Sequence, residues 1–272
     1  MFCKHPLTVK LKSGQYGSVP CGWCINCRIS HSQVWSDRIE MEIKESGGRF
    51  LFFTLTYDDD HVRFTPHGLM TLRPDDHKLF MKRLRIGLQR KGYLKPFKFF
   101  MCGEYGDRFG RPHMHYLLIG YSVDPNIKAV ITRSWPYGLV DIQSPLPTGG
   151  CISYVTKYIL KRYRGKTALD VYDDALPPFQ RSSKGLGKHY YLSHLKEIDN
   201  EELFIRGRPL KVPMSYIDYF PKLKAKIVVN NIDRNLNPSH NSSVKEYLTL
   251  RQAQLKASER ETLLKLKDQR GL

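Results

Sequence analysis

The feature that most constrains the fold is a pair of apolar runs, 97–104 and 112–119, separated by a short loop. The loop reads YGDRFGR, and turn-forming residues between two apolar runs indicate a β-hairpin. A third run, 50–57, reads FLFFTLTY. Its aromatic and threonine content is typical of a central strand that is buried on both faces. The sequence therefore predicts a sheet that contains these three strands.

Helical patterns lie between and after these runs. Apolar spacing and breakers predict helices at 31–46, 75–91, 152–163 and about 243–268. In the 75–91 helix, we expect Asp75 or Asp76 to cap the first turn. The side chains expected on its inner face are Leu79, Phe80, Leu84 and Leu88.

The charge of the chain points to a polyanionic partner. Its 272 residues carry 44 Lys and Arg against 26 Asp and Glu, a net charge of +18. This favours nucleic acid or an anionic membrane surface. No stretch is apolar enough to span a membrane or to form the core of a signal peptide, so we expect a cytoplasmic protein without a membrane partner. Basic residues that could contact phosphates, or simply face solvent, are Lys78, Lys82, Arg83, Arg85, Arg111, Lys184 and Lys188.

Two histidines in the second hairpin strand could bind a divalent ion. His113 and His115 lie two residues apart, so their side chains point to the same face of the strand. Across the hairpin, Glu104 is expected almost opposite His113. Two imidazoles and one carboxylate leave coordination positions open, which suits Mg²⁺ or Mn²⁺ on a phosphate better than a closed zinc site. Taken alone, the histidines could equally be ordinary residues of a half-exposed strand.

The helix at 152–163 contains the unit Tyr-x-x-Lys twice in tandem, as Tyr154–Lys157 and Tyr158–Lys161. Tyr154 and Tyr158 lie one turn apart on one helical face. They could form an aromatic stripe in the core. Other apolar residues of the helix already supply a buried face, which leaves the tyrosines available to face the metal site.

A cluster of cysteines near the N-terminus has the spacing of a metal site. Its close members are Cys21, Cys24 and Cys27. Cys3 is a candidate for the fourth ligand, with His5 or His31 as substitutes, and such a set suits structural Zn²⁺. An iron–sulfur cluster fits less well because the run lacks its fourth cysteine. Reduced thiols without a metal are the remaining interpretation.

Together, these motifs resemble a known family. The run Phe52–Tyr57, the histidine strand and the repeated Tyr-x-x-Lys helix resemble, in this order, the three motifs of HUH endonucleases. Glu104-Tyr105-Gly106 before Arg111-Pro112-His113, with the Cys-x-x-Cys-x-x-Cys-Arg run, is similar to replication initiators of small single-stranded DNA phages, the Microviridae, especially the gokushovirus-like ones. The matching motifs cover roughly residues 20–165.

The resemblance implies an α+β fold in which helices flank a central antiparallel sheet of ferredoxin-like or RNA-recognition-like type, with a C-terminal helical extension. The expected divisions are a cysteine-rich segment at 1–30, a catalytic domain at 31–190 and a basic extension with a terminal helix at 191–272.

The resemblance also implies a rolling-circle initiator that nicks single-stranded DNA at its origin. Tyr154 and Tyr158 would be alternating nucleophiles that form a 5′-phosphotyrosine link and later rejoin the circle, with Lys157 or Lys161 stabilising charge. The expected partners, in the cytoplasm of a bacterial host, are the origin DNA and the host's helicase and DNA polymerase. The alternatives are a non-catalytic basic protein that binds single-stranded nucleic acid, and an HUH transposase or relaxase of another mobile element.

Overall fold

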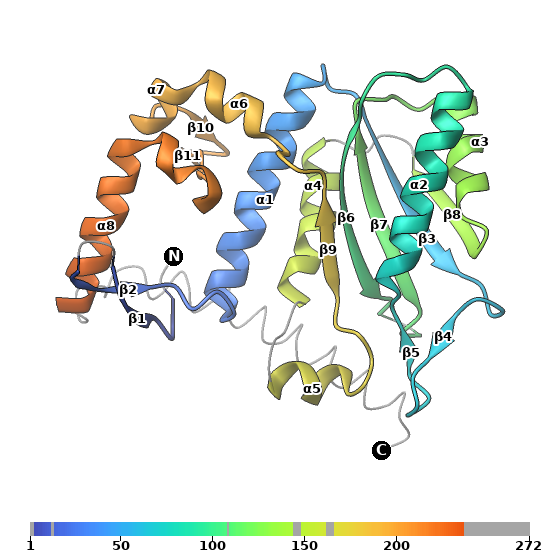
Figure 1. The fold of residues 1–272 in the computed structure, drawn as a ribbon, viewed down its shortest axis with the longest axis horizontal. Coiled ribbons are helices and arrows are strands. Elements are labelled where there is room, and N and C mark those ends of the chain that lie inside the picture. Colours follow the sequence, from blue (N-terminus) through green and yellow to red (C-terminus); the bar gives the residue numbers. More distant parts are fainter. Residues whose placement is uncertain (1–2, 12–13, 108, 144–147, 162–165, 237–272) are drawn as a thin grey trace.

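A five-stranded antiparallel sheet forms the centre of the molecule (Figure 1). The computed structural model describes residues 3–11, 14–107, 109–143, 148–161 and 166–236. In spatial order, the strands of the sheet are β8 (Gly138–Gln143), β3 (Phe50–Tyr57), β7 (Pro112–Ile119), β6 (Lys98–Tyr105) and β9 (Phe179–Ser182). The predicted hairpin is confirmed as β6 and β7, and the predicted buried strand as β3, which has a neighbour on each side.

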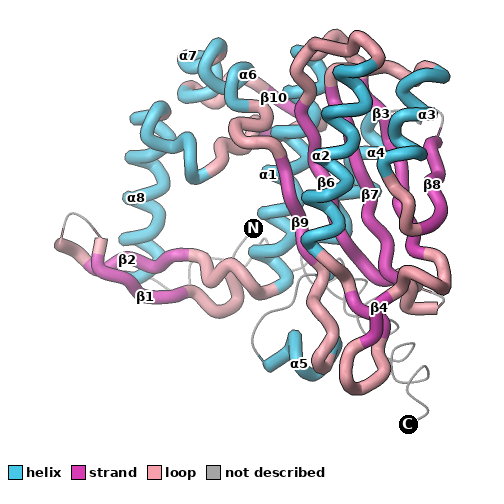
Figure 2. Tube along the Cα trace, turned by 45° about the vertical axis from the view of Figure 1, so that its right-hand side comes forward, coloured by secondary structure: helices cyan, strands magenta, loops and turns pink. Residues whose placement is uncertain are grey.

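Helices cover both faces of this sheet. On one face are α2 (Pro74–Arg90) and α3 (Pro125–Ser134), which lie together along one side of the strands in Figures 1 and 2. On the other face are α1 (Ile25–Glu45), α4 (Thr148–Lys157) and the 3₁₀ helix η1 (Tyr158–Lys161). The predicted α+β class, with helices flanking an antiparallel sheet, is confirmed.

The alternation of side chains along the strands divides the core into two layers. Phe53 and Leu55 of β3 pack with α2 and α3, together with Met114 of β7. Their sequence neighbours point the other way, so Phe52 of β3 and Leu117 of β7 pack under α1 and α4. Each face of β3 therefore meets a different set of helices, which explains why this strand is apolar along most of its length.

The predicted helix at 75–91 exists, but two details of the prediction are wrong. Leu79 does not face the core, because its side chain is 43% exposed, whereas Phe80 is fully buried. Adjacent helical residues lie about 100° apart, and the buried stripe begins beyond Leu79. Neither Asp75 nor Asp76 caps the helix, whose N-cap is Arg73. Asp76 is buried and accepts a hydrogen bond from the Tyr57 hydroxyl at 2.9 Å.

The helix predicted at 31–46 begins earlier than expected, at Ile25. Cys24 is its N-cap residue, so the last predicted zinc ligand, Cys27, lies in the first helical turn. The cysteine run has no apolar periodicity that would reveal this turn. Contacts with distant parts of the chain hold it instead, including a hydrogen bond from the Arg28 guanidinium to the Leu160 carbonyl.

The remaining described elements extend the molecule beyond the sheet. The strands form small hairpins, β1 (Leu7–Lys10) with β2 (Tyr16–Val19), β4 (Arg63–Phe64) with β5 (Met70–Thr71), and β10 (Phe204–Ile205) with β11 (Arg208–Pro209). The helices are α5 (Lys166–Tyr172), α6 (Lys188–Ser193), α7 (Leu195–Asp199), η2 (Met214–Tyr219) and α8 (Pro221–Leu236).

The C-terminal helices are expected from the sequence only in part. A third apolar cluster joins Met41 of α1 to Tyr191 of α6, Ile217 of η2 and Phe220. Although this cluster crosses residue 190, the division expected there stays a prediction. The helix predicted at about 243–268 lies outside the described residues. Within the described ranges, no helix combines the length and the apolar character needed to cross a membrane.

Candidate active site

The two histidines lie on the central strand of the sheet and face α4. Met114 lies between them and is buried in the opposite core layer, against α2 and α3. His113 and His115 therefore share the face of β7 that Leu117 uses to pack under α1 and α4. His115 is 4% exposed, and the two ring centroids lie 6.1 Å apart.

Two threonines of β3 hold the histidine rings. The register of β3 against β7 places Thr54 opposite His115 and Thr56 opposite His113. Thr54 Oγ1 lies 2.9 Å from Nδ1 of His115, and Thr56 Oγ1 lies 3.0 Å from Nδ1 of His113. With Nδ1 engaged in this way, each ring presents Nε2 as the nitrogen available to a metal.

Sequence reasoning missed these two threonines. The signal was present, because Thr54-Leu55-Thr56 has the same two-residue spacing as His113-Met114-His115. Recognising it requires the register of the two strands, which only the structure supplies.

Glu104 lies in the register position predicted for it, opposite His113. Its carboxylate is buried and lies diagonally across the strand pair, with Oε1 2.9 Å from Nε2 of His115. Its second oxygen accepts a hydrogen bond from the Lys161 ammonium at 3.0 Å. Burial disfavours the charged form of Lys161, but the carboxylates of Glu104 and Asp107 outweigh that effect and raise the pKa of Lys161.

The loop between β6 and β7 closes one side of this site. Gly106 lies so close to His113 that a Cβ at this position would be 2.7 Å from Nε2, so a glycine is needed for this close approach. Asp107, the next residue, accepts a hydrogen bond from Lys161 at 2.8 Å. Burial and the neighbouring His115 lower the pKa of His113, which favours the neutral ring that can bind a metal.

The donor set fits a divalent cation in chemistry. Two imidazole nitrogens with oriented rings and one buried carboxylate gather on adjacent strands. In two other groups of described residues, all ligand atoms lie within 4.8 Å of one another, and Glu104, His113 and His115 do not form such a group. An ion held by all three would therefore draw the side chains closer together.

Both tyrosines of the α4–η1 segment lie against His115. The Tyr158 ring is parallel to the imidazole, with centroids 4.8 Å apart, and the Tyr154 ring meets it edge-on at 5.4 Å. Their environments differ, because Tyr154 is 38% exposed and Tyr158 only 4%. Burial, followed by the charge of Glu104, raises the pKa of Tyr158 well above its ordinary value.

The two lysines of the repeated unit lie over the tyrosine rings. Lys157 Nζ is 4.0 Å from the centroid of the Tyr154 ring and 5.1 Å from that of Tyr158. Lys161 Nζ is 5.3 Å from the Tyr158 centroid. These are cation–π distances, and each ammonium is also close enough to favour charge on a phenol oxygen. Burial lowers the pKa of Lys157.

Comparison with known proteins places this arrangement in a family. The family model for the replication-associated protein ORF2 matches residues 50–163, which include every residue of the site above. The "Replication-associated protein ORF2" of Spiroplasma virus 4 is 30% identical over 200 residues, which are 68% of this chain and 60% of that protein. The chain belongs to the phage replication-associated proteins.

Two further relatives agree with this family. The "Replication-associated protein ORF4" of Chlamydia phage 1 is 27% identical over 75% of this chain and 54% of its own length. The "Replication-associated protein VP4" of Bdellovibrio phage phiMH2K is 28% identical over 75% of this chain and 67% of its own. The chain thus spans between 54% and 67% of the length of these three relatives. No solved structure matches the chain.

The matches confirm the predicted kinship with replication proteins of the Microviridae. Membership of the HUH endonucleases, and the roles of the individual site residues in this replication-associated protein, stay predictions.

The basic residues predicted to contact phosphates lie in several places. Lys78, Lys82, Arg83 and Arg85 belong to α2, which covers the face of the sheet opposite to the histidines. Arg111 lies close to the site and donates to the Tyr57 carbonyl at 3.0 Å. Lys184 precedes α6, and Lys188 is its first residue. Their contacts with DNA stay predictions, and α2 could take part only if DNA extended around the molecule.

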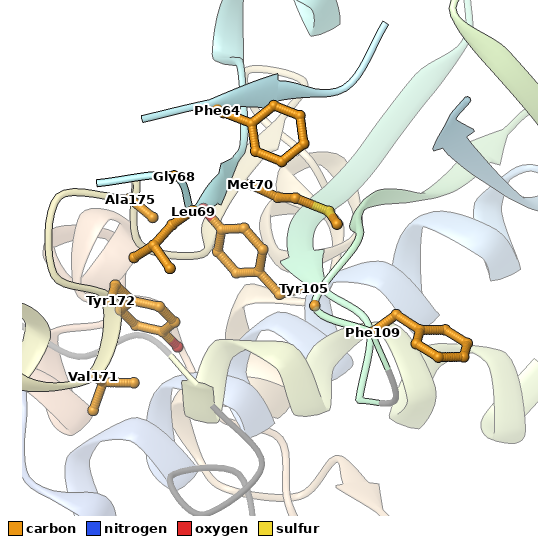
Figure 3. Close-up of a pocket in the computed structure, with 10 residues that line it drawn as sticks. Phe64, Gly68, Leu69, Met70, Tyr105, Phe109, Val171, Tyr172 and Ala175 are labelled. Carbon is orange, nitrogen blue, oxygen red and sulfur yellow. The ribbon is translucent and has the colours of Figure 1, made fainter. Parts of the chain in front are cut away.

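An aromatic pocket adjoins the loop that contacts His113 (Figure 3). Tyr105 and Phe109 border it on the loop side, and Tyr172 of α5 lines the opposite side. The Tyr172 hydroxyl donates to the Lys161 carbonyl at 2.8 Å, which connects the pocket to the end of the tyrosine segment. Phe109 is 66% exposed, so its ring is accessible from solvent.

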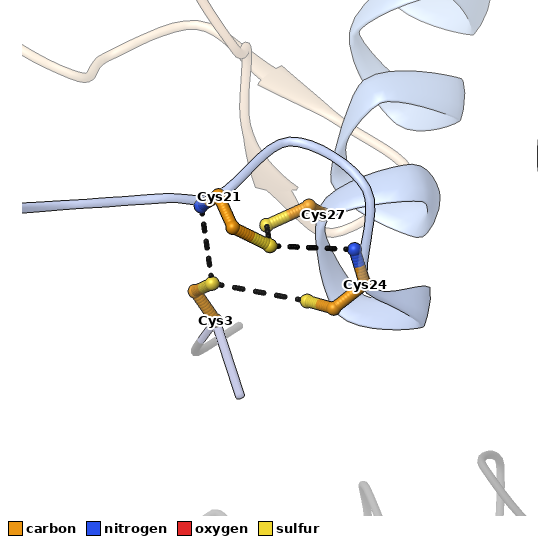
Figure 4. Close-up of side chains that lie close together, drawn as sticks. All are labelled: Cys3, Cys21, Cys24 and Cys27. Carbon is orange, nitrogen blue, oxygen red and sulfur yellow. Dashed lines mark hydrogen bonds between the residues drawn. The ribbon is translucent and has the colours of Figure 1, made fainter. Parts of the chain in front are cut away.

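The four cysteines predicted as zinc ligands come together away from the histidines (Figure 4). Cys3 is the fourth member of the group, and neither His5 nor His31 belongs to it. His31 instead accepts a hydrogen bond from the Trp35 indole at 3.0 Å. Burial raises the pKa of the Cys24 thiol, but backbone amide hydrogen bonds outweigh it and lower the pKa to about 7.

Proposed function

We propose that the chain is a replication initiator that nicks single-stranded DNA at an origin by joining a tyrosine to the 5′ phosphate. The observation that carries this proposal is the contact of both tyrosine rings with His115, at 4.8 and 5.4 Å between centroids. Candidate nucleophiles, candidate metal ligands and two ammonium groups thus share one small region of the molecule. The kinship with replication-associated proteins supports a role in starting replication.

Tyr154 is the first nucleophile in this proposal, because it is the more exposed of the two tyrosines. Its phenol oxygen attacks the scissile phosphorus, and the bond between phosphorus and the 3′ oxygen breaks. The phenol loses its proton, and the 3′ oxygen gains one to become a free 3′ hydroxyl. One phosphodiester is exchanged for another, so the energy for rejoining is retained without ATP.

The neighbouring residues prepare this attack. A phenol is a weak nucleophile at neutral pH, with an ordinary pKa of about 10. Lys157, 4.0 Å from the Tyr154 ring centroid, favours the phenolate that develops during the attack. A divalent ion on His113, His115 and Glu104 would polarise the scissile phosphate. Thr54 and Thr56 keep both imidazoles oriented for that role.

Tyr158 is the second nucleophile in the proposal. After one round of synthesis, it cuts the regenerated origin in the same way. The 3′ hydroxyl released by that cut attacks the Tyr154 phosphotyrosine, the bond between phosphorus and the Tyr154 oxygen breaks, and the circle closes. Since Tyr158 is 4% exposed, its step requires that the segment first opens to DNA.

The partners follow from this chemistry. The free 3′ hydroxyl is a primer for a host DNA polymerase, and strand separation falls to a helicase of the host. The setting for both is the cytoplasm of a bacterium. The net charge of +18 supports binding to single-stranded DNA, which we expect to weaken with salt by a log–log slope of about −0.7 per phosphate contacted.

A covalent adduct is the decisive test. The full chain is incubated with single-stranded DNA that carries the origin of its own replicon, and with Mn²⁺, and is then run on a denaturing gel. We expect a slower band that a chelator prevents, and mass spectrometry should place the DNA on Tyr154. Tyr16→Phe, at an exposed tyrosine of β2, is the matched control and should form the adduct normally.

Two outcomes would contradict the proposal. Adducts that persist in the Tyr154→Phe/Tyr158→Phe double variant would assign the attack to another residue. Tight DNA binding by the unmodified chain without any adduct would favour the non-catalytic binding protein.

A further inference from the structure

The cysteine group has the shape of a tetrahedral metal site. The Sγ atoms of Cys3, Cys21, Cys24 and Cys27 all lie within 4.8 Å of one another. Cys3 and Cys24 are 3.8 Å apart, and Cys21 and Cys27 are 3.9 Å apart. Figure 4 shows the sulfurs pointing toward a common centre from two separate segments of the chain.

These distances select between the chemical states of the sulfurs. A disulfide would bring two Sγ atoms to about 2.0 Å, and these cysteines are free. A tetrahedral zinc with bonds of about 2.3 Å to sulfur holds its ligands about 3.8 Å apart, as these pairs are. A cluster of several irons would attach each sulfur to a different iron and spread them further. We propose that Cys3, Cys21, Cys24 and Cys27 bind one zinc ion in a closed tetrathiolate site.

Backbone groups and charge around the cysteines suit this ligand. The amide of Cys21 donates to the Cys3 sulfur at 3.2 Å, and the amide of Cys24 donates to the Cys21 sulfur at 3.4 Å. Such donors stabilise thiolates. Zinc with four thiolates carries a net charge of −2, and it lies at the N-terminus of α1, whose first turn has no acidic residue. The positive end of the helix thus faces the anionic site.

The zinc site fixes the start of the helix that holds the tyrosine segment. Cys24 caps α1 and Cys27 lies in its first turn. Further along α1, the Ser32 hydroxyl donates to the Thr156 carbonyl at 2.9 Å, and Ser36 Oγ lies 2.9 Å from Thr156 Oγ1. Thr156 lies between the two tyrosines in sequence. A metal bound by residues 3–27 therefore stabilises the position of the 154–161 segment.

This site is independent of the family match and of the proposed nicking. The matched region begins at residue 50, so none of the four cysteines belongs to it. Zinc binding can be measured without DNA, so its failure and the failure of the proposed function are distinguishable.

The metal content of the purified chain is the first measurement. It is made on the full-length His113→Ala/His115→Ala variant, so that an ion at the histidines does not contribute. We expect one zinc per chain by mass spectrometry of the metals. Replacing it with Co²⁺ should give the sulfur-to-cobalt charge-transfer absorption and the intense visible bands of a tetrahedral thiolate site. Adding Cys27→Ser should lower the zinc content at least tenfold, while Cys102→Ala, at a buried cysteine outside the group, should retain one zinc.

A second measurement does not depend on any cysteine variant folding. A thiol-specific mercurial is titrated into the folded chain, and zinc should be released as four sulfurs react. Hydrogen exchange should then increase at 25–32 and 156–161, with β3 and β7 unchanged. Iron in place of zinc, no bound metal, cobalt spectra without thiolate bands, or zinc unaffected by Cys27→Ser would overturn the site. Exchange that increases only at 25–32 would overturn its link to the tyrosine segment.

Discussion

The Tyr158 ring lies parallel to the imidazole of His115, with 4° between the planes and 4.8 Å between the centroids. Tyr158 is therefore both a candidate nucleophile and a packing partner of a candidate metal ligand. Tyr154 contacts the same imidazole only through an edge and is partly open to solvent.

This asymmetry predicts different effects of removing each phenol oxygen. Tyr154→Phe should reduce formation of the first adduct to background, because the accessible nucleophile is lost. Tyr158→Phe should keep the first cut and lose closure of the circle, since its ring and its packing remain. Cleavage and circle formation on origin DNA are measured separately for each variant. Equal loss of the first cut in both would contradict the assigned order.

Thr54 and Thr56 should act as positioning residues. Thr54→Val or Thr56→Val removes the hydroxyl beside a histidine Nδ1, and we expect Mn²⁺ affinity to fall about 10- to 100-fold, as is usual for such outer partners. Serine at the same positions should restore most of the affinity, because it retains the hydroxyl. Isothermal titration with Mn²⁺ measures the change, and Thr132→Val, at an exposed site on α3, is the control. Unchanged affinity in both valine variants would remove the threonines from the site.

Stability should decrease in mild acid because of His77. Burial, with help from the positive charge of Arg181, lowers its pKa from 6.5 to about 4. The folded state thus resists a proton that the unfolded chain accepts, so stability is complete above pH 6.5 and falls as the pH drops toward 4. The loss should approach roughly 3 kcal/mol.

Denaturant unfolding at pH 7, 5.5 and about 4 measures this loss. His77→Gln, which has no titrating group at that position, should show a smaller difference between these pH values. A slope that His77→Gln leaves unchanged would assign the effect to other residues.

Phe109 should contribute to DNA binding by stacking on a base. Its exposed ring borders the aromatic pocket beside the loop that approaches His113 (Figure 3). Stacking of one base on an aromatic ring contributes about 1–3 kcal/mol, so Phe109→Ala should weaken binding of single-stranded DNA roughly 5- to 150-fold. Phe109→Tyr should bind almost normally. Fluorescence anisotropy with a labelled oligonucleotide gives both affinities, and equal binding by Phe109→Ala would exclude the ring from the DNA contact.

The sheet was predictable because local patterns determine it. The runs that became β3, β6 and β7 are apolar, carry β-forming residues and are bounded by turn residues, so their ends were placed within one residue. The opposition of Glu104 and His113 followed from the short hairpin. Leu79 was misplaced because an apolar residue next to the buried stripe looks the same in sequence as one within it.

The difference between the tyrosines could not be predicted in this way. Spacing places Tyr154 and Tyr158 on one face of an ideal helix, but the chain changes from α to 3₁₀ at Tyr158. The angle per residue changes there from about 100° to 120°. Which ring is covered then depends on His115 and on the packing of α1 against α4, and these contacts are distant in sequence.

β7 is hydrogen-bonded to β3 on one edge and to β6 on the other. The imidazoles are therefore anchored in the middle of the sheet, where a shift of the backbone would break two ladders of hydrogen bonds at once. Any opening that admits a DNA strand has to come from the opposite wall, where side chains of α1 hold the tyrosine segment. The histidines thus form the immobile half of the centre, and the pace of each cut is a property of the half that carries the phenols.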